Sequence, residues 1–245
     1  MKRTAALLGG LALVPMLTAC GGSTTTLHVF AAASLKETFT TLGQQFEKAH
    51  PDVRVEFSFG ASDVLASQVD QGAPADVFAT ASTKTMDTVG AKITDRTNFA
   101  SNTMEIAVPP TNPAHITGLA DLAKKDVKVA VCQAEVPCGT VAATVFANAK
   151  LHVTPVTEEV DVKSVLTKVS LGEVDAGIVY VSDVKTAGGT VKGITIPAAV
   201  NAVTTYPISV VADSDHTHLA EEFESLVTGS AGRKALAANG FAGPA

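Results

Sequence analysis

Segments typical of strands and of helices alternate along this 245-residue chain, and this alternation restricts its fold more than any other feature. The segment 27–33 is a short apolar strand, and apolar residues then recur at helical spacing from Leu35 to Phe46. Apolar and polar residues alternate from Val53 to Phe59, as they do in a half-buried strand. The pattern predicts an α/β fold with layers of helices on a sheet.

Serines and small residues stand where predicted strands lead into predicted helices. The three junctions are Ala32-Ala33-Ser34, Gly60-Ala61-Ser62 and Pro137-Cys138-Gly139-Thr140. The start of a helix presents N–H groups without partners inside the helix, together with the positive end of the helix dipole. With few basic residues nearby, such junctions predict a site that holds a small anion by neutral donors. The serines also suit helix caps, and Ser34 followed by Glu37 fits a capping box.

The N-terminus has the pattern of a targeting segment. Two basic residues precede an apolar run from Ala5 to Leu17, which is short for a membrane span. The run leads to Cys20 in a sequence that resembles the lipobox of bacterial lipoproteins, so we expect residues 1–19 to be a lipoprotein signal peptide. Lipidated Cys20 and the flexible tether 20–26 would anchor an exported domain to the outer face of the cell membrane. The alternative is an ordinary secretory signal with an incidental cysteine.

The charge balance excludes some partners. Without residues 1–19 the chain keeps 16 basic residues against 24 acidic ones. An acidic protein of this kind is not expected to bind nucleic acid or an anionic membrane surface. An anionic ligand would therefore be attracted by local dipoles and not by the overall charge.

Cys132 and Cys138 form an even pair once Cys20 is assigned to the anchor. In an exported protein the pair favours a disulfide, worth about 2 kcal/mol for so short a loop. Two buried thiols or a metal site are the alternatives. The spacing lacks neighbouring histidines or further cysteines, so we expect no metal site.

The order of the segments predicts two lobes. The strands Met104–Val108 and Ile208–Ala212 each adjoin prolines, and the block between them has its own pattern of strands and helices. We expect a first lobe of residues 27–106 plus 208–245, a second lobe of residues 107–207, and two hinge strands beside a cleft. The alternative is a single α/β domain without a cleft.

Five segments share their order and spacing with one known family. They are residues 29–35, 59–62, 72–78, 136–139 and 177–180. From about residue 27 to its end, the chain resembles the periplasmic molybdate-binding proteins, which are the substrate-binding proteins of ABC importers. The resemblance implies a two-lobed type II periplasmic-binding-protein fold, molybdate or tungstate as ligand, no cofactor, no free metal cation and no enzymatic activity. The expected partner is the membrane permease of the importer, and we expect a monomer.

The resemblance also implies which residues hold the anion. In that family hydroxyl and main-chain N–H donors of both lobes surround it. In the first lobe the matching positions are Ser34 and Ser62, which would donate through their hydroxyls and main-chain N–H groups. In the second lobe they are Cys138 and Val162, which would donate through their main-chain N–H groups, and Tyr180, which would donate through its phenol. Cys138 departs from the small residue, often alanine, that the family has there. A main-chain donor tolerates this change, and donors alone suit an anion that carries no proton.

Two other functions remain open at this level. A different tetrahedral oxyanion, such as sulfate, could be the ligand. An exported serine hydrolase could use Ser62, because residues 60–64 come near the G-x-S-x-G motif, although Val64 replaces its last glycine. None of the six histidines has a placement that recommends it as the base, which favours a binding protein. Val162 could also be a core residue after an Asp161 helix cap, and Tyr180 a buried aromatic residue.

Overall fold

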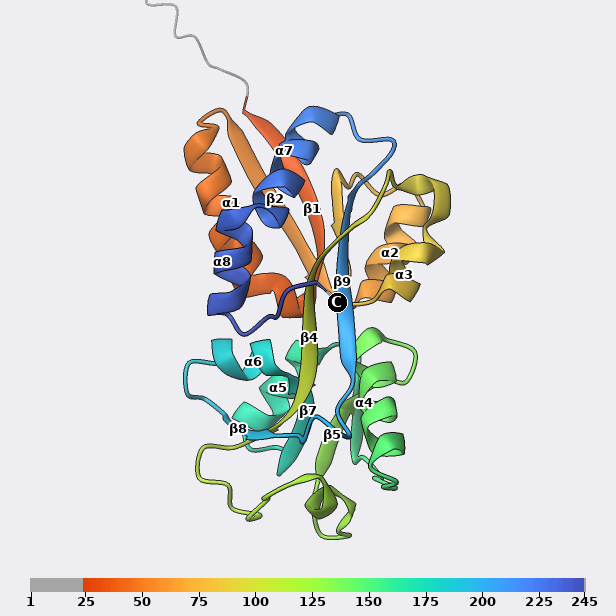
Figure 1. The fold of residues 1–245 in the computed structure, drawn as a ribbon, viewed down its shortest axis with the longest axis vertical. Coiled ribbons are helices and arrows are strands. Elements are labelled where there is room, and N and C mark those ends of the chain that lie inside the picture. Colours follow the sequence, from red (N-terminus) through yellow and green to blue (C-terminus); the bar gives the residue numbers. More distant parts are fainter. Residues whose placement is uncertain (1–23, 245) are drawn as a thin grey trace, which may run out of the picture.

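The computed structural model describes residues 24–244 and has two α/β lobes joined by two long strands (Figure 1). The predicted signal peptide, Cys20 and the first part of the tether lie outside the described residues. No helix within residues 24–244 is long and apolar enough to cross a membrane.

The sheet of the first lobe has the strand order β2-β1-β3-β9-β4. These strands are β1 (Thr25–Ala32), β2 (Val53–Gly60), β3 (Val77–Ala79), β4 (Thr97–Val108) and β9 (Val203–Val210). β1 runs parallel to β2 and β3, whereas β9 runs antiparallel to β3 and β4. The predicted tether therefore ends too late, because its last two residues, Thr25 and Thr26, pair with β2 as part of β1. Both are β-branched, which suits a strand.

Helices cover both faces of this sheet (Figure 1). One face carries η1 (Ala33–Leu35), α1 (Lys36–Ala49), α7 (Thr217–Thr228) and α8 (Ser230–Ala238), and the other carries α2 (Ser62–Asp70), α3 (Thr83–Thr88) and η2 (Gly90–Lys92). The predicted apolar face of α1 is buried: Phe39 and Phe46 pack edge-on against Phe223 of α7. Packing of this kind holds the helix more firmly than helix propensity does.

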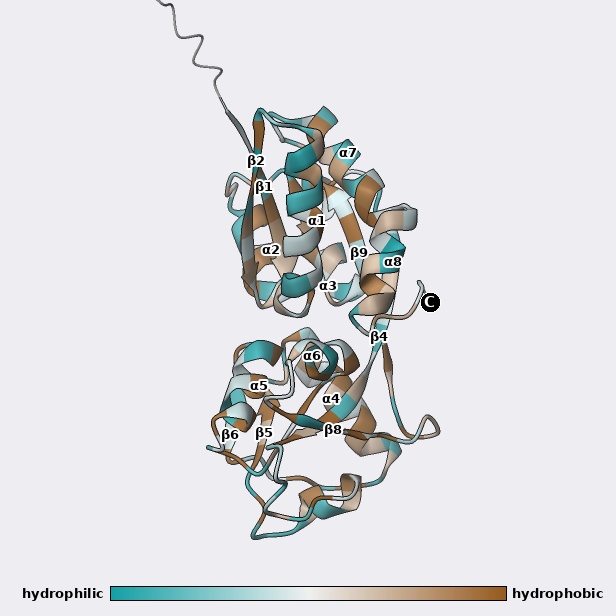
Figure 2. Ribbon diagram, turned by 90° about the vertical axis from the view of Figure 1, so that its left-hand side faces the viewer, coloured by the Kyte–Doolittle hydropathy of each residue, from teal (hydrophilic) through white to brown (hydrophobic). Residues whose placement is uncertain are grey.

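The second lobe is smaller and has the strand order β4-β7-β5-β6, with β8 also paired to β4. Its elements are η3 (Leu119–Ala123), β5 (Val129–Cys132), α4 (Pro137–Asn148), β6 (Thr157–Glu159), α5 (Val162–Ser170), β7 (Ala176–Tyr180), α6 (Val181–Thr186) and β8 (Lys192–Thr195). Gly177 allows α5 to lie close on β7, because an added Cβ there would stand 2.6 Å from a methyl carbon of Val165. In Figure 2 apolar residues are concentrated on the strands and on the inner sides of the helices in both lobes.

Two long strands connect the lobes, and both exceed the predicted hinge strands. Residues 97–103 of β4 pair with β9, and residues 104–108 pair with β7 and β8. β9 begins at Val203, five residues before the predicted start at Ile208, and so contains Pro207. Pro207 faces Asn98 beside an irregularity in the register, and its carbonyl accepts the N–H of Thr80. A strand accommodates a proline at such a place, where the ladder needs no N–H.

Candidate ligand site

A cavity lies where the two lobes meet, and residues of both lobes line it. Its volume of about 20 Å³ exceeds the space that one water molecule needs, so it suits a single small solute. The carboxyl ends of β1 and β2 lead to it from the first lobe, and that of β7 leads to it from the second. Open α/β sheets bind ligands at this end of their parallel strands. All five predicted contact residues line this cavity: Ser34, Ser62, Cys138, Val162 and Tyr180.

Three helices begin at the cavity. Ser62 is the first residue of α2, Cys138 is the second residue of α4, and Val162 is the first residue of α5. The N–H groups of a first helical turn have no acceptor inside their own helix, and the helix dipole places partial positive charge there. α4 begins at Pro137, within the predicted strand-to-helix junction, and this start places Cys138 in the first turn.

The two serines are buried and are engaged by partners distant in sequence. The hydroxyl of Ser34 lies 2.9 Å from the hydroxyl of Tyr206, and the hydroxyl oxygen of Ser62 accepts the N–H of Ala81 at 3.1 Å. Neither serine side chain caps a helix, so the predicted capping box of Ser34 and Glu37 is wrong. The carboxylate of Glu37 instead contacts Lys163 of the other lobe.

Tyr180 brings an unpartnered hydroxyl to the cavity. Its side chain is 1% exposed, and its hydroxyl has no hydrogen-bond partner among the described residues. Burial raises the pKa of this phenol well above its ordinary value, so it stays protonated and can donate. A buried polar group left without a partner costs about 1–3 kcal/mol, and a bound acceptor would remove that cost.

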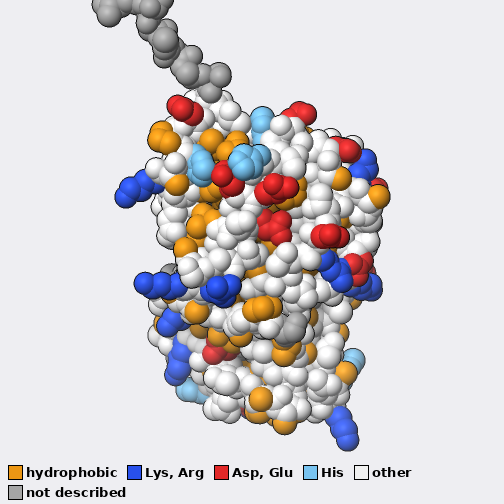
Figure 3. All heavy atoms as spheres, turned by 45° about the horizontal axis from the view of Figure 1, so that its top comes forward, with side chains coloured by type: hydrophobic (Ala, Val, Ile, Leu, Met, Phe, Trp, Pro, Cys, Tyr) orange, Lys and Arg blue, Asp and Glu red, His pale blue; other side chains and the backbone are white. Residues whose placement is uncertain are grey.

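The cavity wall carries little charge. Within residues 24–244 its lining includes no lysine, arginine or histidine, and Asp161 is its one charged residue. The carboxylate of Asp161 accepts the N–H of Ser164 at 2.8 Å, so it caps α5 as the sequence predicted. Figure 3 shows acidic and histidine side chains gathered on the end of the first lobe. The cavity lining of the described residues therefore offers neutral donors and no basic side chain.

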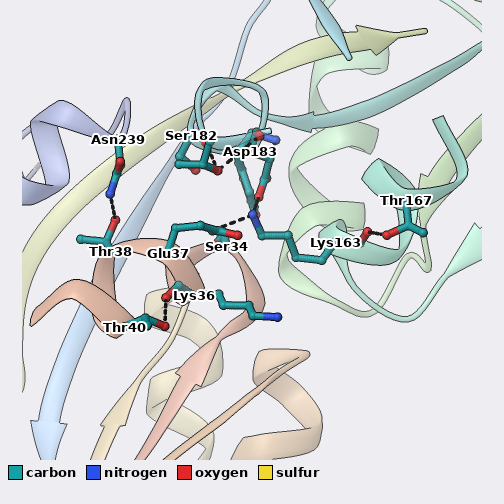
Figure 4. A network of polar contacts seen from close by, with 12 residues as sticks. Ser34, Lys36, Glu37, Thr38, Thr40, Lys163, Thr167, Ser182, Asp183 and Asn239 are labelled. Atoms are coloured by element: carbon teal, nitrogen blue, oxygen red, sulfur yellow. Dashed lines mark hydrogen bonds and ion pairs between the residues drawn. The ribbon is translucent and has the colours of Figure 1, made fainter. Parts of the chain in front are cut away.

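A partly buried ion cluster stands beside the cavity (Figure 4). The ammonium of Lys163 lies 2.8 Å from a carboxylate oxygen of Glu37 in the first lobe and 3.1 Å from one of Asp183 in the second. Burial raises the pKa of Asp183 to about 6, although Lys163 lowers it. Burial also lowers the pKa of Lys163, but Asp183 and Glu37 raise it above its ordinary value. The lysine charge is thus directed to carboxylates and not into the cavity.

Cys132 and Cys138 form a disulfide with an S–S distance of 2.07 Å and a Cα–Cα distance of 5.7 Å. The bond joins the end of β5 to the first turn of α4. Gly139 completes this bend, because an added Cβ would stand 1.8 Å from the carbonyl oxygen of Gln133. Residues 24–244 contain no group of three histidine, cysteine, aspartate or glutamate side chains able to hold a metal ion.

Sequence reasoning missed three groups at the site. Tyr206 contacts Ser34, the N–H of Ala81 contacts Ser62, and Lys163 connects the lobes. Each contact joins positions that only the fold brings together, so no local pattern could reveal its partner. The charged residues of α5 are Lys163 and Lys168, and lysines on a helix are typical of any exposed helix face, so they gave no signal for the ion pair.

A site built from both sides of a junction between two lobes is typical of proteins that capture a small solute. The chain belongs to the bacterial extracellular solute-binding proteins, because that family's model matches residues 27–242.

Individual relatives agree with this assignment. A protein of Mycobacterium tuberculosis H37Rv named molybdate-binding protein ModA is 41% identical over 95% of each chain. The solved periplasmic molybdate-binding protein of Azotobacter vinelandii matches with a TM-score of 0.79 at 20% identity, over 89% of this chain and 100% of that one. The sulfate-binding protein SubI of M. tuberculosis H37Rv matches with a TM-score of 0.76 at 20% identity, over 89% of this chain and 86% of that one. These two structures confirm the two-lobed type II periplasmic-binding-protein fold.

Proposed function

We propose that this protein binds molybdate or tungstate outside the cytoplasm and delivers it to the permease of an ABC importer. The 41% identity to a molybdate-binding protein over nearly the whole chain supports this ligand. The structural likeness to a sulfate-binding protein concerns the fold alone, so sulfate is the ligand to test against. The protein needs no cofactor, because the oxyanion is its cargo.

The observation that carries the proposal is the hydroxyl of Tyr180, buried and without a partner at a cavity with no basic residue. A tetrahedral dianion that has lost all its protons requires donors only. Phenols, serine hydroxyls and main-chain N–H groups can all donate a hydrogen bond to such an anion. A main-chain N–H group can donate a hydrogen bond but cannot accept one. An anion that still carries a proton, such as hydrogen phosphate, would also need an acceptor.

The five proposed contacts come from both lobes. In the first lobe Ser34 and Ser62 donate through their hydroxyls and main-chain N–H groups. The second lobe donates through the main-chain N–H groups of Cys138 and Val162 and through the phenol of Tyr180. The two lobes would move as rigid bodies about the connecting strands. The first lobe consists of residues 27–106 and 208–245, and the second of residues 107–207. The closed form then gains donors from both sides of the anion, whereas the open form offers donors from one lobe only.

The remaining parts of the proposal concern location and partners. Lipidated Cys20 would hold a monomer at the outer face of the cell membrane, where the outer surfaces of both lobes meet the permease. A transport protein of this kind performs no chemistry on its ligand. The hydrolase alternative lacks support, because Ser62 accepts a main-chain N–H and no histidine of the described residues lines its cavity.

Titration calorimetry with molybdate, tungstate, sulfate and phosphate tests the proposal. We expect molybdate and tungstate to bind wild type tightly and to raise its melting temperature, with sulfate and phosphate far weaker. Tyr180→Phe should weaken molybdate binding roughly tenfold or more, because one donor to a charged group is lost. The same variant, free of ligand, should melt no lower than wild type, because the lost hydroxyl had no partner.

Ser209→Ala is the matched control for this variant. It removes a buried hydroxyl of β9 that contacts the main chain around Thr94, away from the cavity. Its molybdate affinity should equal that of wild type. Equal binding of sulfate and molybdate by wild type would contradict the proposed ligand, and unchanged affinity in Tyr180→Phe would contradict the proposed site.

A further inference from the structure

The oxygen atoms of both cavity serines are already engaged, that of Ser62 by Ala81 of the cavity lining and that of Ser34 by Tyr206 outside it. Ser62 Oγ accepts the N–H of Ala81 at 3.1 Å, and Ser34 Oγ lies 2.9 Å from the phenolic oxygen of Tyr206. A serine hydroxyl has a single proton and two lone pairs. The identity of the second partner therefore decides whether the serine donates to a ligand or accepts from it.

For Ser62 the direction is determined by the partner. A main-chain N–H can only donate, so the proton of Ser62 cannot point at Ala81 and is free to point into the cavity. The partner of Ser34 is a phenol, which can donate or accept. Its behaviour determines what Ser34 offers to a ligand.

The surroundings of Tyr206 favour donation. A phenol is more acidic than an aliphatic hydroxyl and is therefore the better donor of the two. Burial raises the pKa of Tyr206 above its ordinary value, so the phenol keeps its proton at physiological pH. The ring is fully buried, with the rings of Phe99, Tyr180 and Phe241 packed at its edges and centroid distances of 5.3–6.3 Å. The packing thus fixes the phenolic oxygen 2.9 Å from Ser34, and Asn102 and Tyr180 also lie near this hydroxyl.

We propose that Tyr206 is a positioning residue that donates its proton to Ser34 Oγ and so directs the Ser34 proton into the cavity. The inference rests on the proposed function and deepens it. With Tyr206 as donor, Ser34 keeps one free lone pair, but accepting a proton from a ligand through it would leave the Ser34 proton without a partner. The site then favours anions that carry no proton over anions that must donate one. β9, which connects the lobes, would contribute to selectivity without touching the ligand.

A double-mutant cycle with Tyr206→Phe and Ser34→Ala tests this role. Tyr206→Phe keeps the packed ring and removes only the hydroxyl. The oxyanion used is whichever of molybdate, tungstate, sulfate and phosphate binds wild type most tightly. We expect Tyr206→Phe to weaken binding roughly tenfold in the wild-type background and by less than twofold in the Ser34→Ala background. Ser209→Ala, another buried hydroxyl of β9, should leave affinity unchanged.

The outcomes separate the two proposals. If wild type binds sulfate in place of molybdate, the proposed ligand is wrong. The double-mutant cycle, measured with sulfate, then still tests the positioning role of Tyr206. Effects of the two substitutions that multiply, or an unchanged affinity in Tyr206→Phe, overturn the positioning role. Wild type that binds none of the four anions overturns both proposals.

A crystal structure of the wild-type complex decides the matter if Tyr206→Phe fails to fold. We expect Ser34 Oγ within hydrogen-bond distance of both the Tyr206 hydroxyl and an oxygen of the anion. A Tyr206 hydroxyl that has turned to another acceptor, or to the anion itself, would refute the proposed arrangement.

Discussion

The ammonium of Lys163 in α5 lies 2.8 Å from a carboxylate oxygen of Glu37 in α1, and these helices belong to different lobes. The ion pair stands beside the cavity, and Lys163 also contacts the buried carboxylate of Asp183 (Figure 4). An attraction that spans the junction stabilises the closed arrangement relative to an open one. Ligand affinity should therefore depend on a pair that does not touch the ligand.

Glu37→Gln removes the charge and keeps the shape of the side chain. Because the pair is partly exposed, we expect the molybdate dissociation constant to rise only roughly threefold at low salt. The difference from wild type should shrink in 0.5 M salt, where the attraction is screened. Calorimetry at both salt concentrations measures this. Glu56→Gln, on an exposed carboxylate of the first lobe, is the control. Equal affinities of Glu37→Gln and wild type at low salt would exclude a contribution of the pair to closure.

The carboxyl group of Asp183 should make stability depend on pH. Burial raises its pKa from 3.8 to about 6, so the folded protein binds this proton more tightly than the unfolded chain does. The resulting stabilisation is complete below about pH 3.8 and is lost as the pH rises through about 6. The free energy of unfolding of wild type, relative to Asp183→Asn, should fall by up to about 3 kcal/mol between pH 4 and pH 7. Urea unfolding at several pH values tests this, and a difference that rises with pH would show that the ionised form is favoured.

The sequence allowed the site's position to be predicted because its residues follow a local rule. Ser34 and Ser62 each stand just after the end of a strand, and Cys138 stands at the start of a helix, whereas Val162 and Tyr180 were named only by the family resemblance. The α/β alternation, the two lobes and the start of α5 at Val162 follow from similarly local patterns. What these residues do at the site was supplied by the family resemblance and stays a prediction.

Contacts with distant partners override two of the local patterns in this chain. Ser34 and Glu37 have the spacing of a capping box, yet Tyr206 and Lys163 engage them across 172 and 126 positions. Pro207 marks a strand end by its missing N–H, yet the irregular register of β4 accommodates it inside β9. Local propensity cannot weigh such contacts, because they exist only once the chain has folded.

The disulfide between Cys132 and Cys138 is expected to stabilise the fold and to hold the loop 132–138, which leads into the first turn of α4. The double variant Cys132→Ser with Cys138→Ser should lose about 2 kcal/mol of unfolding free energy, because the short loop gains freedom in the unfolded chain. Its molybdate affinity should fall as well, since the first turn of α4 is then less firmly held. Denaturation and calorimetry of the variant, and of wild type with a reducing agent, measure both effects. A variant as stable as wild type would mean that strain in the bond offsets the entropic gain.

Gly139 offers the most stringent test of the same loop. An added Cβ would stand 1.8 Å from the carbonyl oxygen of Gln133, and main-chain atoms on both sides must move to relieve this clash. We expect Gly139→Ala to lose about 2 kcal/mol or more of unfolding free energy. Its molybdate affinity should fall at least roughly tenfold, because the neighbouring N–H of Cys138 is displaced.

Gly118→Ala is the matched control for that substitution, since an added Cβ there has no atom within 4 Å and the backbone is extended. Its stability should stay within about 0.5 kcal/mol of wild type, with unchanged affinity. If Gly139→Ala loses stability but binds molybdate normally, the loop shapes the fold without positioning a donor, and Cys138 is not a ligand contact. If both properties fall together, the close approach at Gly139 is a requirement of the site itself.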